Sequence, residues 1–158
     1  MQKDLDKYIE TKQQLKGEPL LERKLLAFQV ELAELANETR CFKFWSEKEP
    51  SACEVILEEY VDGIHFLLSV GIEFGFDNQP VIVYPIPAEA TKNELVETFF
   101  NSMEAIVHLR EEKTRLSYEN LFRVYLSLGA KLGFSSDDVE EAYLKKNEVN
   151  HQRQDQGY

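Results

Sequence analysis

Two acidic pairs lie inside the most apolar stretches of this 158-residue chain, and they limit how it can fold. The first pair is Glu31 and Glu34, and the second is Glu59 and Asp62. Each has the spacing i, i+3, so on an α-helix its carboxylates lie on one face about one turn apart. Carboxylates held against an apolar interior lose their water at a large cost unless a positive charge meets them. We therefore expect two helices whose four carboxylates face one cleft around a cation.

The acidic pairs also have a second interpretation, because carboxylates at this spacing are common on solvated helix faces, where they bind nothing. Two pairs in two apolar segments favour a metal site instead. Hard oxygen ligands are typical of Mg²⁺, which shares them with waters and substrate phosphates. His65 falls on one helical face with Glu58 and Asp62, and we expect it to be a hydrogen-bonded residue behind the ligands.

Apolar residues recur at helical spacing along most of the chain and predict an all-α fold. The predicted helices cover about residues 4–16, 19–39, 51–74, 92–110, 118–132 and 136 onwards. Pro19 is placed in the first turn of the second helix, where its missing N–H costs nothing. Thr91 with Glu94, and separately Ser117, are the predicted N-caps of the fourth and fifth helices.

Residues 75–90 interrupt the helical pattern, because their three prolines exclude a helix. A short extended segment at 81–84 has no partner strand in the sequence, so the stretch is interpreted as an ordered loop. The expected architecture is a multi-helix bundle of about six helices with one Pro-rich loop. At this length, residues 1–158 are expected to form a single domain.

The charge and cysteine content exclude several classes of protein. The chain has 29 acidic and 18 basic residues, a formal charge of −11, which argues against nucleic acid or an anionic membrane as partner. A small nucleotide stays compatible, because a bound metal reverses the local field. Cys41 and Cys53 are too few for a disulfide framework, so a cytoplasmic location is expected. No signal peptide or membrane span is expected either.

An aromatic segment, residues 41–46, joins the two helices that carry the acidic pairs. It is either a hydrophobic plug between helices or a face that stacks on a flat ligand. In the second case Trp45 contributes to the stacking surface and Lys43 meets a phosphate.

The last residues of the chain concentrate cations and amides in an otherwise acidic protein. On a helix Lys146, Asn150 and Arg153 share a face, with Asn147 beside them. Such groups suit phosphate and sugar oxygens. The alternative is a solvated, fraying C-terminus.

Three motifs together point to a known family. Glu31-x-x-Glu34 and Glu59-x-x-Asp62, separated by residues 35–58, resemble the signature of the all-α nucleoside triphosphate pyrophosphohydrolases. The segments 35–46 and 60–69 and the terminal pattern of residues 146–158 are similar to the dimeric dUTPases, in the form found in Gram-positive bacteria and their phages. The resemblance covers nearly the whole chain.

The resemblance implies an all-α homodimer that hydrolyses dUTP, with or without dUDP, to dUMP. It implies more than one Mg²⁺, held by Glu31, Glu34, Glu59 and Asp62. Carboxylate-held metals neutralise phosphate oxygens and activate water, so no serine, cysteine or histidine nucleophile is required. Glu34, or a carboxylate beside it, is predicted to orient and deprotonate the attacking water.

The resemblance also implies a set of substrate contacts. The residues expected to contact phosphates and deoxyribose are Lys146, Asn147, Asn150, Arg153 and Tyr158, with Lys43 and Trp45 near the same pocket. Gln13 is expected to read the uracil. Lys16 stands where the family pattern has asparagine, so a sibling enzyme acting on dCTP or a modified nucleotide stays open. A non-catalytic, nucleotide-sensing or partner-binding helical dimer is the remaining alternative.

Overall fold

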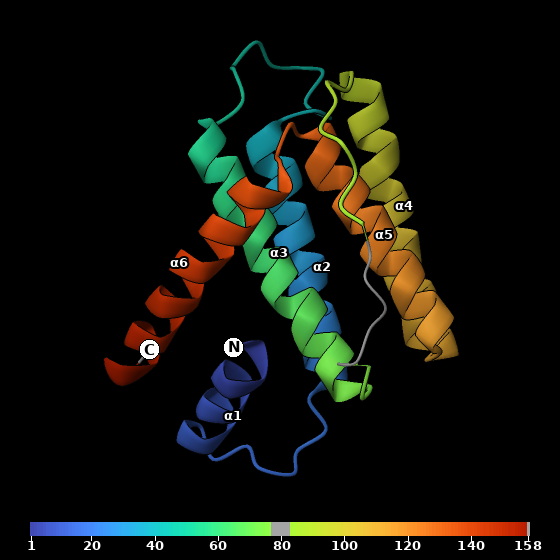
Figure 1. Ribbon diagram of the computed structural model, residues 1–158. Helices are drawn as coiled ribbons and strands as arrows, with labels where there is room; N and C mark the ends of the chain where they lie inside the picture. Colours follow the sequence, from blue (N-terminus) through green and yellow to red (C-terminus); the bar gives the residue numbers. More distant parts are fainter. Residues whose placement is uncertain (77–82, 158) are drawn as a thin grey trace.

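The computed structural model describes residues 1–76 and 83–157, and its helices form an elongated bundle (Figure 1). The helices are α1 (Gln2–Lys12), α2 (Leu21–Thr39), α3 (Cys53–Glu73), α4 (Lys92–Glu112), α5 (Arg115–Lys131) and α6 (Ser136–Asp155). The described residues contain six helices and no strand, which confirms the predicted all-α class. The predicted extended segment at 81–84 lies partly outside the described residues, and residues 83–90 carry no helix.

Helix α3 occupies the centre of the bundle and contacts α1, α2, α5 and α6, while α4 packs on α2 and α5. The core consists of apolar side chains with almost no exposed surface. The largest of these include Phe28, Leu32, Leu35, Tyr60, Leu67, Leu121, Tyr125 and Leu128. Burying each such aliphatic or aromatic side chain stabilises the fold by roughly 1.5–3 kcal/mol.

Glycines let α5 approach α3 closely. A Cβ atom at Gly63 would lie 2.0 Å from the Tyr125 hydroxyl, and one at Gly71 would lie 2.3 Å from the Tyr118 hydroxyl. The Tyr125 hydroxyl donates to the Tyr60 carbonyl at 2.9 Å, and the two rings stack with centroids 4.8 Å apart. Gly63 therefore allows the side chain of Tyr125, a residue of the same chain, to approach the backbone of α3 closely.

Two predicted helix ends are wrong. Helix α1 ends at Lys12 instead of residue 16, and Gln14 has a left-handed backbone with φ of 58°. The end of α1 bonds to α6, where Lys12 donates to the Gln154 carbonyl, so a tertiary contact overrides the local helical pattern. Helix α2 begins at Leu21 with Leu20 as its N-cap, so Pro19 lies outside the helix.

The predicted cap of α5 is also wrong by three residues. The N-cap is Thr114, and Ser117 is its partner in a capping box, with the Ser117 N–H donating to Thr114 Oγ1 at 3.2 Å. Both residues are hydroxylic and both bond across the first turn, so the sequence pattern fits either register. The predicted cap Thr91 is confirmed, and Ser135 is the N-cap of α6. Among the helices described, none is long and apolar enough to cross a bilayer.

Candidate metal and nucleotide site

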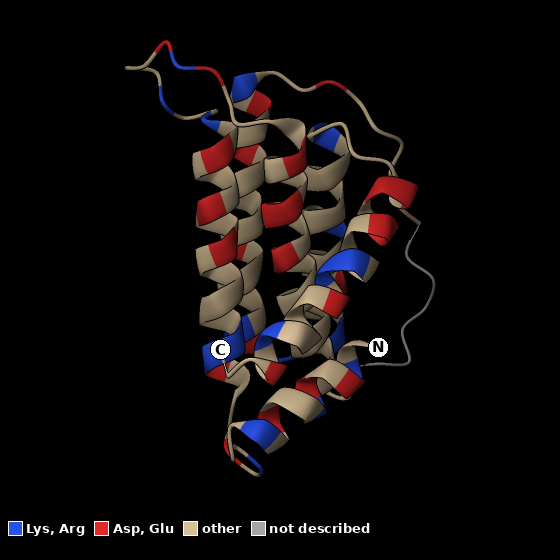
Figure 2. Cartoon of the chain, turned by 90° about the vertical axis from the view of Figure 1, so that its left-hand side faces the viewer, with Lys and Arg blue, Asp and Glu red and all other residues tan. Residues whose placement is uncertain are grey.

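The two acidic pairs meet where α2 packs on α3. Carboxylate oxygens of Glu31, Glu34 and Glu59 lie within 4.8 Å of one another. The i, i+3 spacing puts each pair on one helix face, and the packing of α2 on α3 turns those faces together. Figure 2 shows acidic residues on neighbouring turns of the upright helices, with Lys and Arg on the inclined α6 that crosses them.

The electrostatics of this carboxylate cluster favour a bound cation. Burial, followed by the nearby charges of Asp62, Glu34 and Glu59, raises the pKa of Glu31 to about 7. Burial and then Asp62 and Glu34 also raise the pKa of Glu59. Like charges this close cannot all ionise without help. An oxygen-only set of ligands fits Mg²⁺, which would relieve the repulsion.

Asp62 lies beside the cluster and is paired with a lysine from α6. The Lys146 Nζ atom is 2.7 Å from Asp62 Oδ2 and 2.7 Å from Glu58 Oε1. Burial raises the pKa of Asp62, and the hydrogen bond from Lys146 opposes this rise. Asp62 still acts on the cluster, because it is the like charge that raises the pKa of Glu31 most.

A cavity of about 310 Å³, partly open to solvent, adjoins these carboxylates and is lined by residues of α1, α2, α3 and α6. Its volume is at the lower end of the range for small-molecule sites. The lining residues combine charges and amides with an apolar part: Gln2, Leu5, Asp6, Ile9, Glu31, Asp62, His65, Phe66, Ser69, Asn150 and Arg153. The cavity thus brings two of the predicted metal ligands, Glu31 of α2 and Asp62 of α3, together with predicted phosphate-binding residues of α6.

Two of the predicted substrate contacts on α6, Asn150 and Arg153, line the cavity. Lys146 reaches it through its bond to Asp62, and Asn147 is buried next to Lys146 in the chain. The Asn147 amide nitrogen is buried with no hydrogen-bond partner in the part of the chain that the structure describes. A buried donor without a partner is costly, and a ligand oxygen would satisfy it.

A polar network from α1 completes one wall of the cavity, and sequence reasoning missed it. The side-chain oxygen of Gln2, Oε1, accepts from His65 Nδ1 at 2.8 Å and from the Tyr143 hydroxyl at 3.0 Å. Its amide donates to Asp6 Oδ1 at 2.7 Å, and Asp6 also accepts from Ser69 at 2.6 Å. The available signal was Asp6, an acidic residue next to Leu5 on the apolar face of the first helix. His65 is hydrogen-bonded, as expected.

Three of the remaining predicted contacts, Gln13, Lys43 and Trp45, do not line the cavity. Gln13 follows α1 as its C-cap, and its amide donates to Gln154 Oε1 at 3.2 Å. Lys43 and Trp45 lie on the loop between α2 and α3, away from the cavity lining. Tyr158 lies outside the described residues.

The aromatic segment on that loop is exposed, so the interpretation as a plug between helices is wrong. Phe44 is 94% exposed and Trp45 63%. The Trp45 ring packs edge-to-face on Phe44, with centroids 5.1 Å apart, and on Phe42 at 5.9 Å. A surface aromatic cluster of this kind is available to a ligand or a second chain.

The fold and the site together define a class, an all-α protein in which a cavity lies beside a cluster of carboxylates that could hold a metal ion. The family model described as dUTPase matches residues 1–158. The chain therefore belongs to the all-α dimeric dUTPase family, and its activity is that of a dUTP diphosphatase. Among curated proteins, no match to this chain was found.

Proposed function

We propose that the chain hydrolyses dUTP to dUMP and pyrophosphate in a Mg²⁺-dependent reaction at the carboxylate cluster. The observation that carries this proposal is the approach of Glu31, Glu34 and Glu59 to within 4.8 Å of one another. Together with Asp62 they would hold the metal. Bound Mg²⁺ would neutralise charge on the phosphate oxygens and make the attacking water more acidic.

Glu34 would orient the attacking water and accept its proton. It belongs to the cluster, yet it is the one exposed residue among the three clustered glutamates. An exposed carboxylate keeps access to water, whereas Glu31 and Glu59 are half-buried. A general base has to lie within hydrogen-bond reach of the proton that it abstracts.

Residues of α6 would hold the rest of the nucleotide. Lys146 and Arg153 carry the charges that suit phosphate oxygens, and Asn147 and Asn150 offer amides to phosphate or deoxyribose oxygens. The assignment of Gln13 as the uracil reader, and of Lys43, Trp45 and Tyr158 as further contacts, rests on the family resemblance. Cys41 and Cys53 are both free thiols, which supports a cytoplasmic location.

A homodimer is proposed through the outer face of α2 and α4. Leu26 and Val30 of α2 and Phe100 and Val107 of α4 are large apolar side chains that are at least 46% exposed. An apolar cavity of about 290 Å³ lies between the same helices and includes Phe42. Contiguous exposed apolar surface of this kind marks interaction sites, and a second copy of the chain would cover it.

The test is pyrophosphate release from the four dNTPs, dUTP and UTP, measured with Mg²⁺ and with EDTA. We expect turnover of dUTP that EDTA abolishes. Turnover directed at dCTP or at several nucleotides would keep the metal site and overturn the substrate assignment, which Lys16 leaves open. Turnover that persists in EDTA would overturn the metal role. No turnover at all would favour a nucleotide-sensing or partner-binding dimer.

A further inference from the structure

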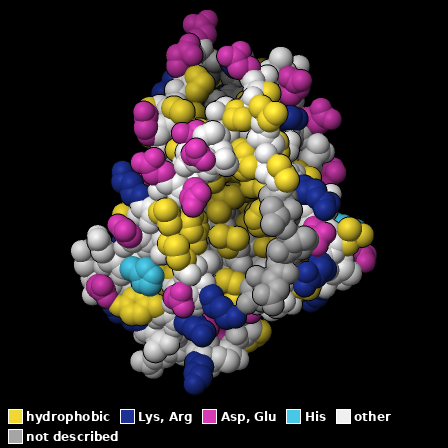
Figure 3. Space-filling view, in the orientation of Figure 1, with side chains coloured by type: hydrophobic (Ala, Val, Ile, Leu, Met, Phe, Trp, Pro, Cys, Tyr) yellow, Lys and Arg dark blue, Asp and Glu magenta, His cyan; other side chains and the backbone are white. Residues whose placement is uncertain are grey.

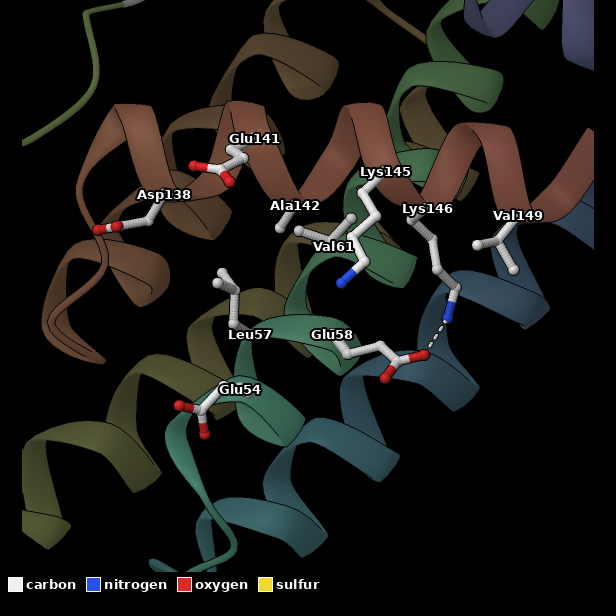
Figure 4. Close-up of a pocket in the computed structure, with 10 residues that line it drawn as sticks. All are labelled: Glu54, Leu57, Glu58, Val61, Asp138, Glu141, Ala142, Lys145, Lys146 and Val149. Atoms are coloured by element: carbon white, nitrogen blue, oxygen red, sulfur yellow. Dashed lines mark hydrogen bonds and ion pairs between the residues drawn. The ribbon is translucent and has the colours of Figure 1, made fainter.

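Lys146 is held by two carboxylates of α3, only one of which belongs to the predicted metal-binding set. Glu58 and Asp62 lie one turn apart, and each accepts from the Lys146 Nζ atom at 2.7 Å. The Lys146 side chain is 10% exposed, and that of Glu58 is 55% exposed. Figure 4 shows the bond between Lys146 and Glu58 at the edge of a pocket between α3 and α6.

A metal ion and the Lys146 ammonium would compete for Asp62. Both are cations, and at close range their repulsion is strong in a partly buried site. If Asp62 were the sole partner of Lys146, metal binding would leave a buried ammonium without its counter-charge, which is strongly destabilising. Glu58 offers a carboxylate that stands outside the clustered ligand atoms of Glu31, Glu34 and Glu59.

We propose that Glu58 is a positioning residue, which keeps the Lys146 ammonium beside the cavity when Asp62 binds a metal ion. Lys146 is then already extended when the triphosphate arrives, and it loses less side-chain freedom on binding the phosphate oxygens. This inference rests on the proposed function and adds to it a residue outside both acidic motifs. The bond to Glu58 remains while the bond to Asp62 is replaced.

The pocket beside the ion pair supplies a matched control. It has a volume of about 440 Å³ and is lined on its apolar side by Leu57, Val61, Ala142 and Val149. Glu54 lines the same pocket one turn before Glu58 on α3. Glu54→Gln therefore removes the same charge from the same helix and pocket without touching the Lys146 ion pair.

The experiment is a double-mutant cycle with Glu58→Gln, Lys146→Met and the double variant. Calorimetry measures binding of Mg²⁺ alone, and then of a non-hydrolysable α,β-imido dUTP in the presence of Mg²⁺. We expect Glu58→Gln to weaken both by about tenfold, a coupling usual for contacting charges. In the Lys146→Met background the same change should alter both by less than about twofold, and Glu54→Gln should behave like wild type.

Equal effects of Glu58→Gln in both backgrounds would overturn the inference, because Glu58 would then act only through its charge on the metal. An equal effect of Glu54→Gln would overturn it for the same reason. A wild-type chain that binds no Mg²⁺ would overturn this inference and the metal site together. A further outcome is that the cycle shows the coupling between Glu58 and Lys146 in Mg²⁺ binding while wild type fails to bind the dUTP analogue. In that case the substrate assignment alone fails. Thermal unfolding of each variant checks that it is folded.

Discussion

At the scale of single residues, the partly buried carboxylates that reduce the stability of the fold are the ones that suit the proposed metal-dependent hydrolysis. Glu31 is half-buried among carboxylates, and its pKa of about 7 shows how much its charged form is disfavoured without a cation. A hydrophobic residue at this position would be less costly. A cation held by these carboxylates, as the proposed function requires, would offset this cost.

Changing Glu34 to Gln tests its role as the base. The amide keeps the size of the side chain but cannot accept the proton, so kcat should fall by about 10²- to 10⁴-fold. Affinity for the Mg²⁺ complex of a non-hydrolysable dUTP analogue should change by less than about threefold, since Glu31, Glu59 and Asp62 remain. Steady-state kinetics and calorimetry separate the two effects. Equal losses of turnover and affinity would make Glu34 a plain metal ligand.

His65 gives a prediction for stability against pH. Burial lowers its pKa from 6.5 to about 4, so the unfolded chain binds this proton more readily than the folded one. The contribution of His65 to stability should therefore fall as the pH drops below 6.5, by about 2 kcal/mol between pH 7 and pH 5. The raised pKa of Glu31 acts in the opposite direction over this interval, so the contribution of His65 is measured by comparison with a variant. Urea unfolding at the two pH values measures it. From pH 7 to pH 5, the change in the free energy of unfolding should be about 2 kcal/mol less favourable in wild type than in His65→Gln. Equal changes in the two proteins would contradict the low pKa of His65.

At the scale of helices, sequence patterns located the elements but not all of their ends. Thr91 with Glu94 was recognisable because an N-cap and its acidic partner form a local signal. Thr114 and Ser117 gave an ambiguous signal, since either hydroxyl could occupy the cap. The end of α1 depends on its contact with α6, more than a hundred residues away. No local pattern records such a contact.

Gly63→Ala tests the close packing of α3 on α5. Its Cβ atom would meet the Tyr125 hydroxyl, which must move and lose its bond to the Tyr60 carbonyl. We expect the free energy of unfolding to fall by about 1–3 kcal/mol, the usual effect of overpacking. Chemical denaturation measures the loss. In a Tyr125→Phe background the alanine should be less harmful, because the nearest clashing atom is gone. The same loss in both backgrounds would place the strain elsewhere.

At the scale of the whole molecule, the site is assembled from segments that lie far apart in the chain. The sequence identified the carboxylates of α2 and α3 and the cations of α6. It could not show that Lys146 would bond to Glu58 and Asp62, or that Gln2 and Asp6 would line the same cavity. These contacts follow from how the helices cross, which side-chain periodicity within one helix does not encode.

The proposed dimer face predicts the effect of a charge at its centre. Leu26 is 62% exposed on α2, so Leu26→Glu should leave the monomer folded and place unpaired charges in the interface. We expect the homodimer to dissociate in light scattering coupled to size exclusion. Leu116→Glu is the matched control, because Leu116 is 71% exposed on α5, outside this face. A dimer that survives Leu26→Glu would exclude this face.

The contact between α1 and α6 has a consequence for the time at which the protein becomes active during synthesis. Tyr8 donates to Asp155, and Lys12 donates to the Gln154 carbonyl, so the first helix is held by the last. On the ribosome, α2 and α3 can pair long before α6 exists, and their carboxylates then face one another without Lys146 or Arg153. Under the proposed function, a nascent chain would therefore gain its metal ligands early, and the α6 residues of its cavity only after α6 has left the exit tunnel.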